Sequence, residues 1–395
     1  MAIEHGSNND PASLITKLQQ LATRLSNNDH EAKKDCLQLS KALTAQLEPP
    51  ENIAVDMAYT PMIAATVRIA IDLNLFEHIV QYSPVPATRL AALSGAEEPL
   101  VFRILRLLSA VHFVEETAPR TWKATPITEA MATKGIPAGH RMISEALVPA
   151  IQRAPAFFAQ RGYTCPIDPS NGLLQAAFKT DQTTFEYIAS NPSLHKDFNM
   201  FMGNATGTRR SWLDWYPVQS RILDGADPDR PLLVDVGGGK GHDLVAFNER
   251  FPGKGKLVLQ DMSAVIGGVG ELDNAIETAA YDFFAEQPLT GARVYFYHHI
   301  LHDWSDRYCV EILKRVAAAM TPGYSKLLVH EMIVPELGAS RFEAQMDISM
   351  MVFNGGMERT GGEWRALLGL AGLKVVEVWE PVDEGGDGII EAVRI

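Results

Sequence analysis

A glycine-rich turn between an apolar segment and an amphipathic one constrains the fold of this chain more than any other feature. Leu232 to Val234 has the character of a buried strand, and His242 to Phe247 has the pattern of a helix. The glycines of 237–241 lie between them, and glycine lets the backbone approach a ligand that a Cβ atom would push away. The segment therefore predicts a strand, a glycine turn and a helix N-terminus that together bind a nucleotide.

The acids around this turn indicate which nucleotide. The spacing is Asp-x-Gly-x-Gly-x-Gly, from Asp235 through Gly237 and Gly239, and it is shorter than the pattern of a dinucleotide site. Asp235 would repel a pyrophosphate but suits the ammonium and sulfonium groups of S-adenosylmethionine. Asp261 ends the next predicted strand and suits ribose hydroxyls. We therefore expect this methyl donor, with an ordinary strand-to-helix turn as the alternative.

The composition of the chain argues against several classes of partner and site. The 395 residues carry a net charge of −13 without a dense stripe of Lys and Arg, so we expect neither nucleic acid nor an anionic membrane as a partner. Residues 1–11 are polar, and no uninterrupted apolar run approaches the length of a membrane span. Cys36, Cys165 and Cys309 are scattered without metal-ligand spacing, so we expect no disulfide framework and no metal. These features favour a cytoplasmic protein.

The chain divides into four predicted segments, residues 1–50, 51–134, 135–215 and 216–395. The first is a helical arm with recurring leucines and a polar break at 26–29. This arm can pack on its own chain or on a partner subunit. The third segment is helical but irregular, and it is rich in proline, methionine and aromatic residues.

The second segment has the order of a winged helix, with three helices before a hairpin. The helices are predicted at 53–80, 88–95 and 99–111, and the hairpin at 113–124. In isolation this order would suggest DNA binding. The third helix, however, carries only two arginines amid leucines, and the segment is not basic. We therefore expect a mainly helical domain that does not bind DNA.

Strands and helices alternate through the fourth segment, which predicts an α/β fold with a Rossmann-like, doubly wound sheet of seven strands. The last two strands are joined by residues 383–388, a connection too short for a crossover helix, so they must pair antiparallel. The predicted strands are 231–236, 256–260, 276–281, 293–298, 326–333, 374–380 and 388–394.

Polar side chains follow several of these strands, at the edge where ligands bind in parallel sheets. Asp282 follows the third strand and can take an adenine amino group, while Phe283 can cover the base. His298, at the end of the fourth strand, and His299 alternate with His302, so we expect their side chains to point away from it.

His302 is the predicted general base. Methyl transfer to a hydroxyl needs the two reactants held in line and the hydroxyl proton removed, and a neutral imidazole suits that task. A carboxylate on the far ring nitrogen would fix the tautomer. Glu331 and Glu358 can fill this role if the loop 355–360 folds over the site. The alternative is that His302 only caps the helix that follows it.

Apolar side chains near this loop can form either a substrate wall or ordinary core. The predicted substrate-contacting residues are Phe198, Met202, Asp303, Met350, Met351 and Phe353.

Taken together, these motifs resemble the plant-type family of O-methyltransferases that use S-adenosylmethionine, which includes the caffeate and flavonoid enzymes, and the likeness is closer to its fungal secondary-metabolite branch. It extends over most of the chain. The matching segments are Val234 to Leu244, Leu259 to Asp261, Asp282 to Phe284, Ile300 to Asp306, Leu328 to Pro335 and Glu358 to Thr360.

The resemblance implies a homodimer formed through the N-terminal domain, a small aromatic or polyketide-like substrate, and S-adenosylhomocysteine as product. It also implies His302 as the base, with Glu331 and Glu358 supporting it. Many plant members carry a lysine at the position of His298, so the donor contact there differs. Some fungal relatives bind the donor but guide ring closure without methyl transfer, which is the alternative function. The implied donor contacts are Gly237, Gly239, Asp261, Asp282, Phe283 and Trp304.

Overall fold

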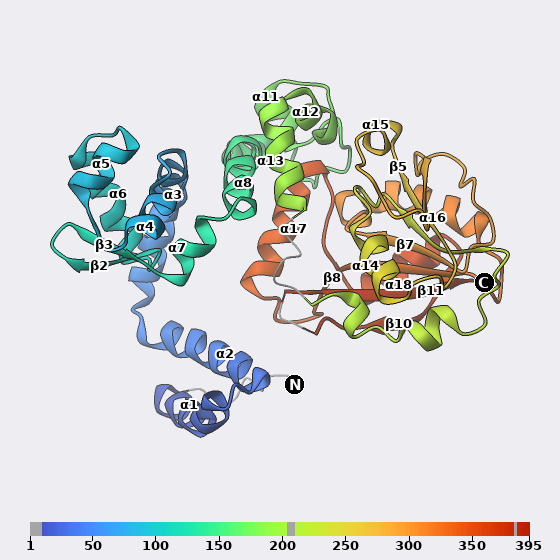
Figure 1. The fold of residues 1–395 in the computed structure, drawn as a ribbon, viewed down its shortest axis with the longest axis horizontal. Coiled ribbons are helices and arrows are strands. Elements are labelled where there is room, and N and C mark those ends of the chain that lie inside the picture. The colour runs from blue at the N-terminus through green and yellow to red at the C-terminus, as the bar shows by residue number, and fades with distance from the viewer. Residues whose placement is uncertain (1–9, 204–209, 383–384) are drawn as a thin grey trace. The chain divides into compact units, whose positions relative to one another are not determined.

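The computed structural model describes residues 10–203, 210–382 and 385–395, and it separates into two compact units that are described one at a time. The first unit ends at Thr133 and the second begins at Lys134. The predicted arm therefore groups with the N-terminal domain, and the predicted segment 135–215 groups with the sheet domain. Figure 1 shows both units, with many of their elements labelled.

The N-terminal unit begins with two helices that pack against each other, α1 (Pro11–Ser26) and α2 (His30–Leu47). The predicted polar break separates them, because Asp29 accepts a hydrogen bond from the backbone N–H of Ala32 at 3.1 Å and so caps α2. Leu14 of α1 and Ala32 of α2 are fully buried. The two helices therefore pack against each other as a helical hairpin.

The helix predicted at 53–80 is wrong in one respect, because the structure has two helices there, α3 (Pro50–Asp72) and α4 (Leu75–Tyr82). Asn74 between them has φ +50°, and this left-handed conformation ends the first helix. The remaining predicted elements of this unit are present, and a short added strand extends the hairpin to a three-stranded antiparallel sheet in the order β1-β3-β2. These elements are β1 (Val85–Pro86), α5 (Ala87–Ser94), α6 (Glu98–Ala110), β2 (Val114–Ala118) and β3 (Thr121–Ala124).

Helix α3 is long and apolar on average. Its 23 residues and mean hydropathy of 1.2 make it long and apolar enough to cross a membrane, and 11% of the apolar window is buried. Charged residues at 51, 56, 68 and 72 interrupt the apolar sequence of α3, so the expectation that no uninterrupted apolar run reaches that length is not contradicted. One such helix is weak evidence of a span, and Arg68 pairs with Asp72 at 2.9 Å near its end.

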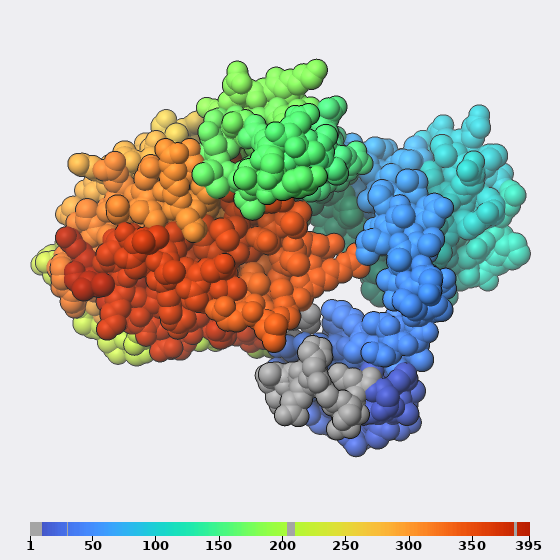
Figure 2. Space-filling model, turned by 180° about the vertical axis from the view of Figure 1, so that it is seen from behind, coloured from blue at the N-terminus to red at the C-terminus, as the bar shows by residue number. Residues whose placement is uncertain are grey.

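The second unit begins with a group of short helices that share a core of their own. In Figure 2 this green segment lies against the orange-red segment that contains α17 (Arg341–Asn354). Helix α11 contacts α17, and Leu173, Leu174 and Phe353 lie in the shared core. The helices are α8 (Gly135–Met142), η1 (Ile143–Leu147), α9 (Val148–Gln152), α10 (Ala154–Gln160), α11 (Leu173–Phe178), α12 (Thr184–Ser190) and α13 (Pro192–Met202), after α7 (Pro126–Met131) of the first unit.

All seven predicted strands form one sheet, in the order β10-β11-β8-β7-β4-β5-β6. Strand β11 lies between β10 and β8 and is antiparallel to both, while the other neighbours in this order are parallel. A two-residue strand, β9, pairs with β8 outside this order. The strands are β4 (Pro231–Val236), β5 (Lys256–Asp261), β6 (Ile276–Ala280), β7 (Val294–His298), β8 (Lys326–Val334), β9 (Arg359–Thr360), β10 (Leu373–Trp379) and β11 (Asp387–Arg394).

Helices cover both faces of this sheet, as a doubly wound fold requires (Figure 1). Helices α16 (Asp306–Ala319) and α18 (Gly361–Leu370) bury one face, and α14 (His242–Arg250) packs with Trp212 on the other. The chain therefore brings the carboxyl ends of the parallel strands to one edge. Shorter helices complete the unit: η2 (Trp212–Asp214), η3 (Gln219–Leu223), α15 (Ser263–Ile266) and η4 (Leu301–Asp303).

Candidate active site

The glycine turn after β4 needs glycine for two reasons. Gly237 and Gly239 have φ +75° and +58°, a left-handed region that other residues rarely adopt. A Cβ atom on Gly237 would also lie 2.6 Å from the side chain of Ile300. The space where a Cβ of Gly239 would lie is open. The turn therefore fits a ligand that approaches its backbone.

Two of the predicted donor-binding acids lie at the carboxyl ends of β5 and β6, the strands that continue the sheet on one side of β4. Asp261 directly contacts the glycine turn, and Asp282 follows β6. Asp261, at the end of β5, accepts hydrogen bonds from the backbone N–H groups of Gly239 at 2.9 Å and Met262 at 2.7 Å. Burial raises its pKa, and these two bonds oppose that change. Asp282 is exposed and accepts from the backbone N–H of Phe284 at 3.0 Å.

Asp235 does not lie where we expected it. Its side chain points beneath the turn, against the position that a Cβ of Gly238 would take, and 1% of the residue is exposed. Burial, and then the neighbouring Asp243, raise the pKa of Asp235 well above its usual range. A neutral carboxyl below the loop does not offer the charge for a sulfonium that the sequence suggested. The structure therefore supports a role for Asp235 beneath the loop and not a direct contact with the donor.

Three aromatic rings lie together after β6 and β7. The ring of Trp304 meets those of Phe283 and Phe284 edge-on, with centroids 5.9 Å and 4.9 Å apart. Phe283 also lies 3.9 Å from the position of a Cβ on Gly237. Both predicted adenosine-contacting aromatics are thus grouped beside the glycine turn.

His302 lies on η4, directly after β7, and is 7% exposed. Its Nδ1 lies 2.9 Å from Oε1 of Glu358 and 3.6 Å from Oε2 of Glu331. A carboxylate at Nδ1 favours the tautomer that carries its proton there, which leaves Nε2 as the basic nitrogen. Asp303 Oδ1 is 3.8 Å from that Nε2. The structure brings His302, Glu331 and Glu358 together.

Glu331 has a second role that sequence reasoning missed. Its Oε1 accepts hydrogen bonds from the backbone N–H groups of Ile300 at 2.9 Å, Leu301 at 2.8 Å and His302 at 3.4 Å. Three amides on one carboxylate oxygen fix the backbone that carries the imidazole. Glu358 is therefore the direct partner of the ring, and Glu331 holds the turn beneath it.

The loop after α17 folds onto this turn, as the support of His302 by Glu358 requires. The N–H of Met357 donates to the carbonyl of His302 at 2.9 Å, and Asn354 Nδ2 donates to the carbonyl of Asp303 at 3.1 Å. The N–H of Glu358 donates to Asp347 Oδ1 at 3.0 Å. These bonds fix the position of the Glu358 carboxylate against His302.

His299 contradicts our expectation that it points away from His302. The two rings are stacked, with centroids 5.1 Å apart and an angle of 20° between their planes. His298 lies against His330 of β8, with ring centroids 4.1 Å apart, and its Nδ1 is 2.7 Å from Asp243 Oδ2. Burial lowers the pKa of His298, but Asp243 and then Asp387 outweigh it and raise the value to about 9.

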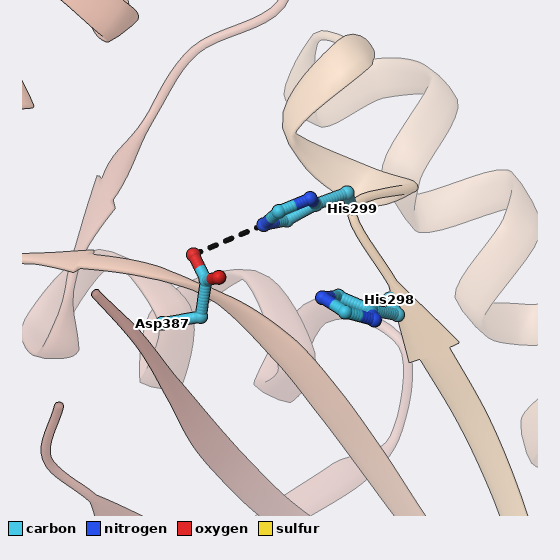
Figure 3. A group of neighbouring side chains, drawn as sticks. All are labelled: His298, His299 and Asp387. Atoms are coloured by element: carbon cyan, nitrogen blue, oxygen red, sulfur yellow. Dashed lines mark ion pairs between the residues drawn. The ribbon is translucent and has the colours of Figure 1, made fainter. Parts of the chain in front are cut away.

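His298, His299 and Asp387 could together hold a metal ion, because one ligand atom of each lies within 4.8 Å of the others. Figure 3 shows both imidazole rings directed toward the carboxylate of Asp387. This grouping was not predicted from the sequence, since Asp387 follows the two histidines by more than eighty residues.

The apolar residues among the predicted substrate contacts differ in burial: most are buried or partly buried, and one is exposed. Phe353 is 6% exposed and stacks parallel to Phe198 at 6.3 Å, so both belong to the core of the helical segment. Met350 is buried and Met351 is partly buried on the same helix. Met202, at the end of α13, is 44% exposed. Core packing thus explains Phe353 and Met350 without a substrate.

Two family models match this chain. An O-methyltransferase domain matches residues 175–374, and an O-methyltransferase dimerisation domain matches residues 55–134. The chain belongs to the plant-type O-methyltransferase family. Its relatives place it in the fungal secondary-metabolite branch, and it is an S-adenosylmethionine-dependent O-methyltransferase.

The O-methyltransferase penC of Penicillium thymicola is 59% identical over 388 residues, which are 98% of each chain. The O-methyltransferase asqD of Emericella nidulans is 58% identical over 338 residues, 85% of this chain and 87% of its own. Among solved structures, LepI in complex with S-adenosylmethionine aligns over 98% of this chain and 100% of its own, with a TM-score of 0.86 and 28% identity. A structure described as a pericyclic reaction enzyme aligns over 97% and 99%, with a TM-score of 0.85 and 29% identity.

The residues of this O-methyltransferase fit S-adenosylmethionine as the cofactor. The open space beside Gly239, the carboxylate of Asp261 and the ring of Phe283 surround one turn. The open space would admit a nucleoside beside the turn, the carboxylate would bind its ribose hydroxyls, and the aromatic ring would cover its base.

The protonation of His302 gives a prediction that needs no methyl acceptor. Burial lowers its pKa, but Glu331, Asp303 and Glu358 outweigh burial and raise it well above 6.5. The imidazolium form therefore persists above that pH, and its stabilisation is fully present at low pH and is lost as the pH rises through the folded pKa. We expect an NMR titration of the His302 ring to show this raised pKa. Glu358→Gln removes one negative charge and should lower the pKa, whereas an unchanged titration would contradict this account.

Arg359 is a positioning residue that the sequence did not single out. Its guanidinium is 1% exposed and donates to the carbonyls of Leu301 at 3.1 Å and Trp304 at 2.9 Å, on either side of His302. It also donates to Asp306 at 3.0 Å. Lysine cannot reproduce this fork.

We therefore expect Arg359→Lys to lower the free energy of unfolding by about 3 kcal/mol and to shift the NMR titration of His302. Arg365, exposed on α18, offers the control: Arg365→Lys should leave both quantities unchanged. A variant at 359 with wild-type stability and titration would remove Arg359 from the support of the site.

Proposed function

We propose that this O-methyltransferase methylates a hydroxyl group, a phenol or an enol, of a small aromatic or polyketide-like secondary metabolite. The observation that carries the proposal is the 2.9 Å contact between Nδ1 of His302 and Glu358. It leaves Nε2 as the acceptor for a hydroxyl proton. Ile300, two residues before His302, lies against Gly237 of the donor turn, so base and donor turn are neighbours.

Bound S-adenosylmethionine supplies an electrophilic methyl group, and the protein supplies position and a base. Nε2 of His302 takes the proton of the acceptor hydroxyl as the oxygen becomes nucleophilic. The imidazolium that forms is stabilised by Glu358 at 2.9 Å and Glu331 at 3.6 Å. Glu331 also keeps the turn in place through three backbone amides.

The N-terminal unit is proposed to act as a winged-helix dimerisation domain in a cytoplasmic homodimer that binds neither nucleic acid nor membrane. Support comes from the dimerisation-domain match and from the exposed apolar side chains of α3. A second copy would cover them, which also gives α3 a reason for its hydropathy. These side chains are Ile53, Val55, Met57, Tyr59, Met62 and Ile69.

A second candidate is a pericyclase or cyclase that binds the donor without transferring its methyl group. The observation in its favour is the 29% identity to a structure described as a pericyclic reaction enzyme, over 97% of this chain. Against it, His302, Glu331 and Glu358 are all present and in contact.

The test is incubation of the protein with methyl-labelled S-adenosylmethionine and a panel of phenols and enolic polyketides. Label in the product together with one equivalent of S-adenosylhomocysteine supports methyl transfer. A changed ring skeleton without S-adenosylhomocysteine supports the second candidate and overturns the first.

A further inference from the structure

A group of three metal-ligating side chains lies at the edge of the sheet beside the candidate active site. Strand β11 runs antiparallel to β8, so its first residue, Asp387, lies at the same edge as the carboxyl end of β7. His298 ends β7 and His299 follows it. The fold therefore joins two adjacent histidines to an aspartate from a distant part of the chain (Figure 3).

We propose that His298, His299 and Asp387 form a binding site for a divalent transition-metal ion of the zinc, cobalt and nickel class. Two imidazoles and one carboxylate are ligands that these ions prefer, and no thiolate ligand is needed. The ion would join β7 to β11. Water would complete its coordination.

The distances agree with this assignment. Nε2 of His299 and Oδ1 of Asp387 are 3.0 Å apart. Two ligand atoms bound to one ion at about 2.1 Å, at an angle of about 90° to 110°, are about 3 to 3.4 Å apart. The third ligand atom lies within 4.8 Å of the others, so a small shift of His299 and Asp387 toward the His298 ring would complete the set.

The other nitrogen of His298 provides a second, independent observation. Its Nδ1 is 2.7 Å from Asp243 on α14, which fixes the ring and directs Nε2 away from that carboxylate. Carboxylates hold metal-binding histidines in this way. Nε2 of His298 is buried and has no hydrogen-bond partner. A buried nitrogen of this kind costs about 1 to 3 kcal/mol when it is unsatisfied.

A simple ion pair between His299 and Asp387 is the competing interpretation. It accounts for the 3.0 Å distance but leaves Nε2 of His298 without a partner. A metal ion accounts for all three side chains. It would also lie close to His302, because the rings of His299 and His302 are stacked at 5.1 Å, so its positive charge would lower the pKa of His302.

The test uses the full chain without an affinity tag, treated with a chelator and then titrated with Zn²⁺ or Co²⁺ in a calorimeter. We expect one equivalent to bind at micromolar or lower Kd, and the unfolding midpoint to rise with metal. Asp387→Asn and His299→Asn should each weaken binding at least about 10-fold. His195→Asn, an exposed histidine on α13, should bind as the wild type does.

Asp243→Asn provides a separate test of the support, since loss of such a carboxylate weakens metal binding about 10- to 100-fold. Each variant is checked for folding by S-adenosylhomocysteine binding. Absence of stoichiometric binding, or binding that the variants at 299 and 387 leave unchanged, would overturn the proposal. Metal binding is measured without an acceptor substrate, so its outcome is independent of the proposed methyl transfer.

Discussion

His302→Ala is expected to reduce methyl transfer by about two to four orders of magnitude, the usual contribution of a general base. The substitution removes the nitrogen that accepts the hydroxyl proton and leaves Glu358 without the partner it has at 2.9 Å. Binding of S-adenosylhomocysteine should survive, because the predicted donor contacts lie on the glycine turn and at the ends of β5 and β6. Single-turnover rates with saturating donor, together with calorimetry, measure the two quantities separately.

The control is His195→Ala, because His195 is an exposed histidine outside the site. Turnover of that variant should equal that of the wild type. His302→Gln separates base chemistry from packing, since glutamine fills much of the space but its amide cannot act as a base. A variant at 302 that retains full turnover would show that the hydroxyl loses its proton elsewhere, while loss of donor binding would show that the turn has collapsed.

Strand positions and the chemistry of the glycine turn could be predicted because both are local in sequence. Buried strands appear as apolar runs, and a turn that needs left-handed backbone appears as glycine. The position of β11 between β10 and β8 could not be predicted in this way, because hydrogen bonding with β8 depends on residues about sixty positions apart. The break at Asn74 was missed for a related reason, since apolar residues continue on both sides of it.

The same limit explains the errors at the site. Asp235 has the right spacing for the turn, but whether its side chain points above or below the loop depends on the packing around Gly238, which sequence spacing does not reveal. Alternation along a strand predicted that His299 points away, yet His299 has φ +52°, which ends the alternation. His302, Glu331 and Glu358 were found from their positions after strands and in the loop. Arg359 and Asp387 were missed because their roles depend on contacts with distant segments.

At Gly356, the addition of a single methyl group is expected to reduce methyl transfer strongly. A Cβ atom there would lie against the carbonyl oxygen of His302, 2.6 Å from the carbonyl carbon of Asp303 and 2.8 Å from its oxygen. These are backbone atoms of a turn whose neighbouring peptide groups bond to Glu331 and Arg359, so they cannot move aside as a side chain would. The loop itself must therefore shift.

We accordingly expect Gly356→Ala to reduce methyl transfer about 100-fold, the scale of a misplacement of about 1 Å in an active site, and to destabilise the fold by about 1 to 3 kcal/mol. Glu358 follows two residues later, so the shift should separate it from His302 and lower the pKa of that imidazole. Gly369→Ala is the matched control, because nothing lies within 4 Å of a Cβ at that helical position and alanine stabilises a helix relative to glycine. Wild-type turnover and an unshifted His302 titration in Gly356→Ala would mean that the 2.9 Å contact between Glu358 and His302 does not depend on close packing of the loop.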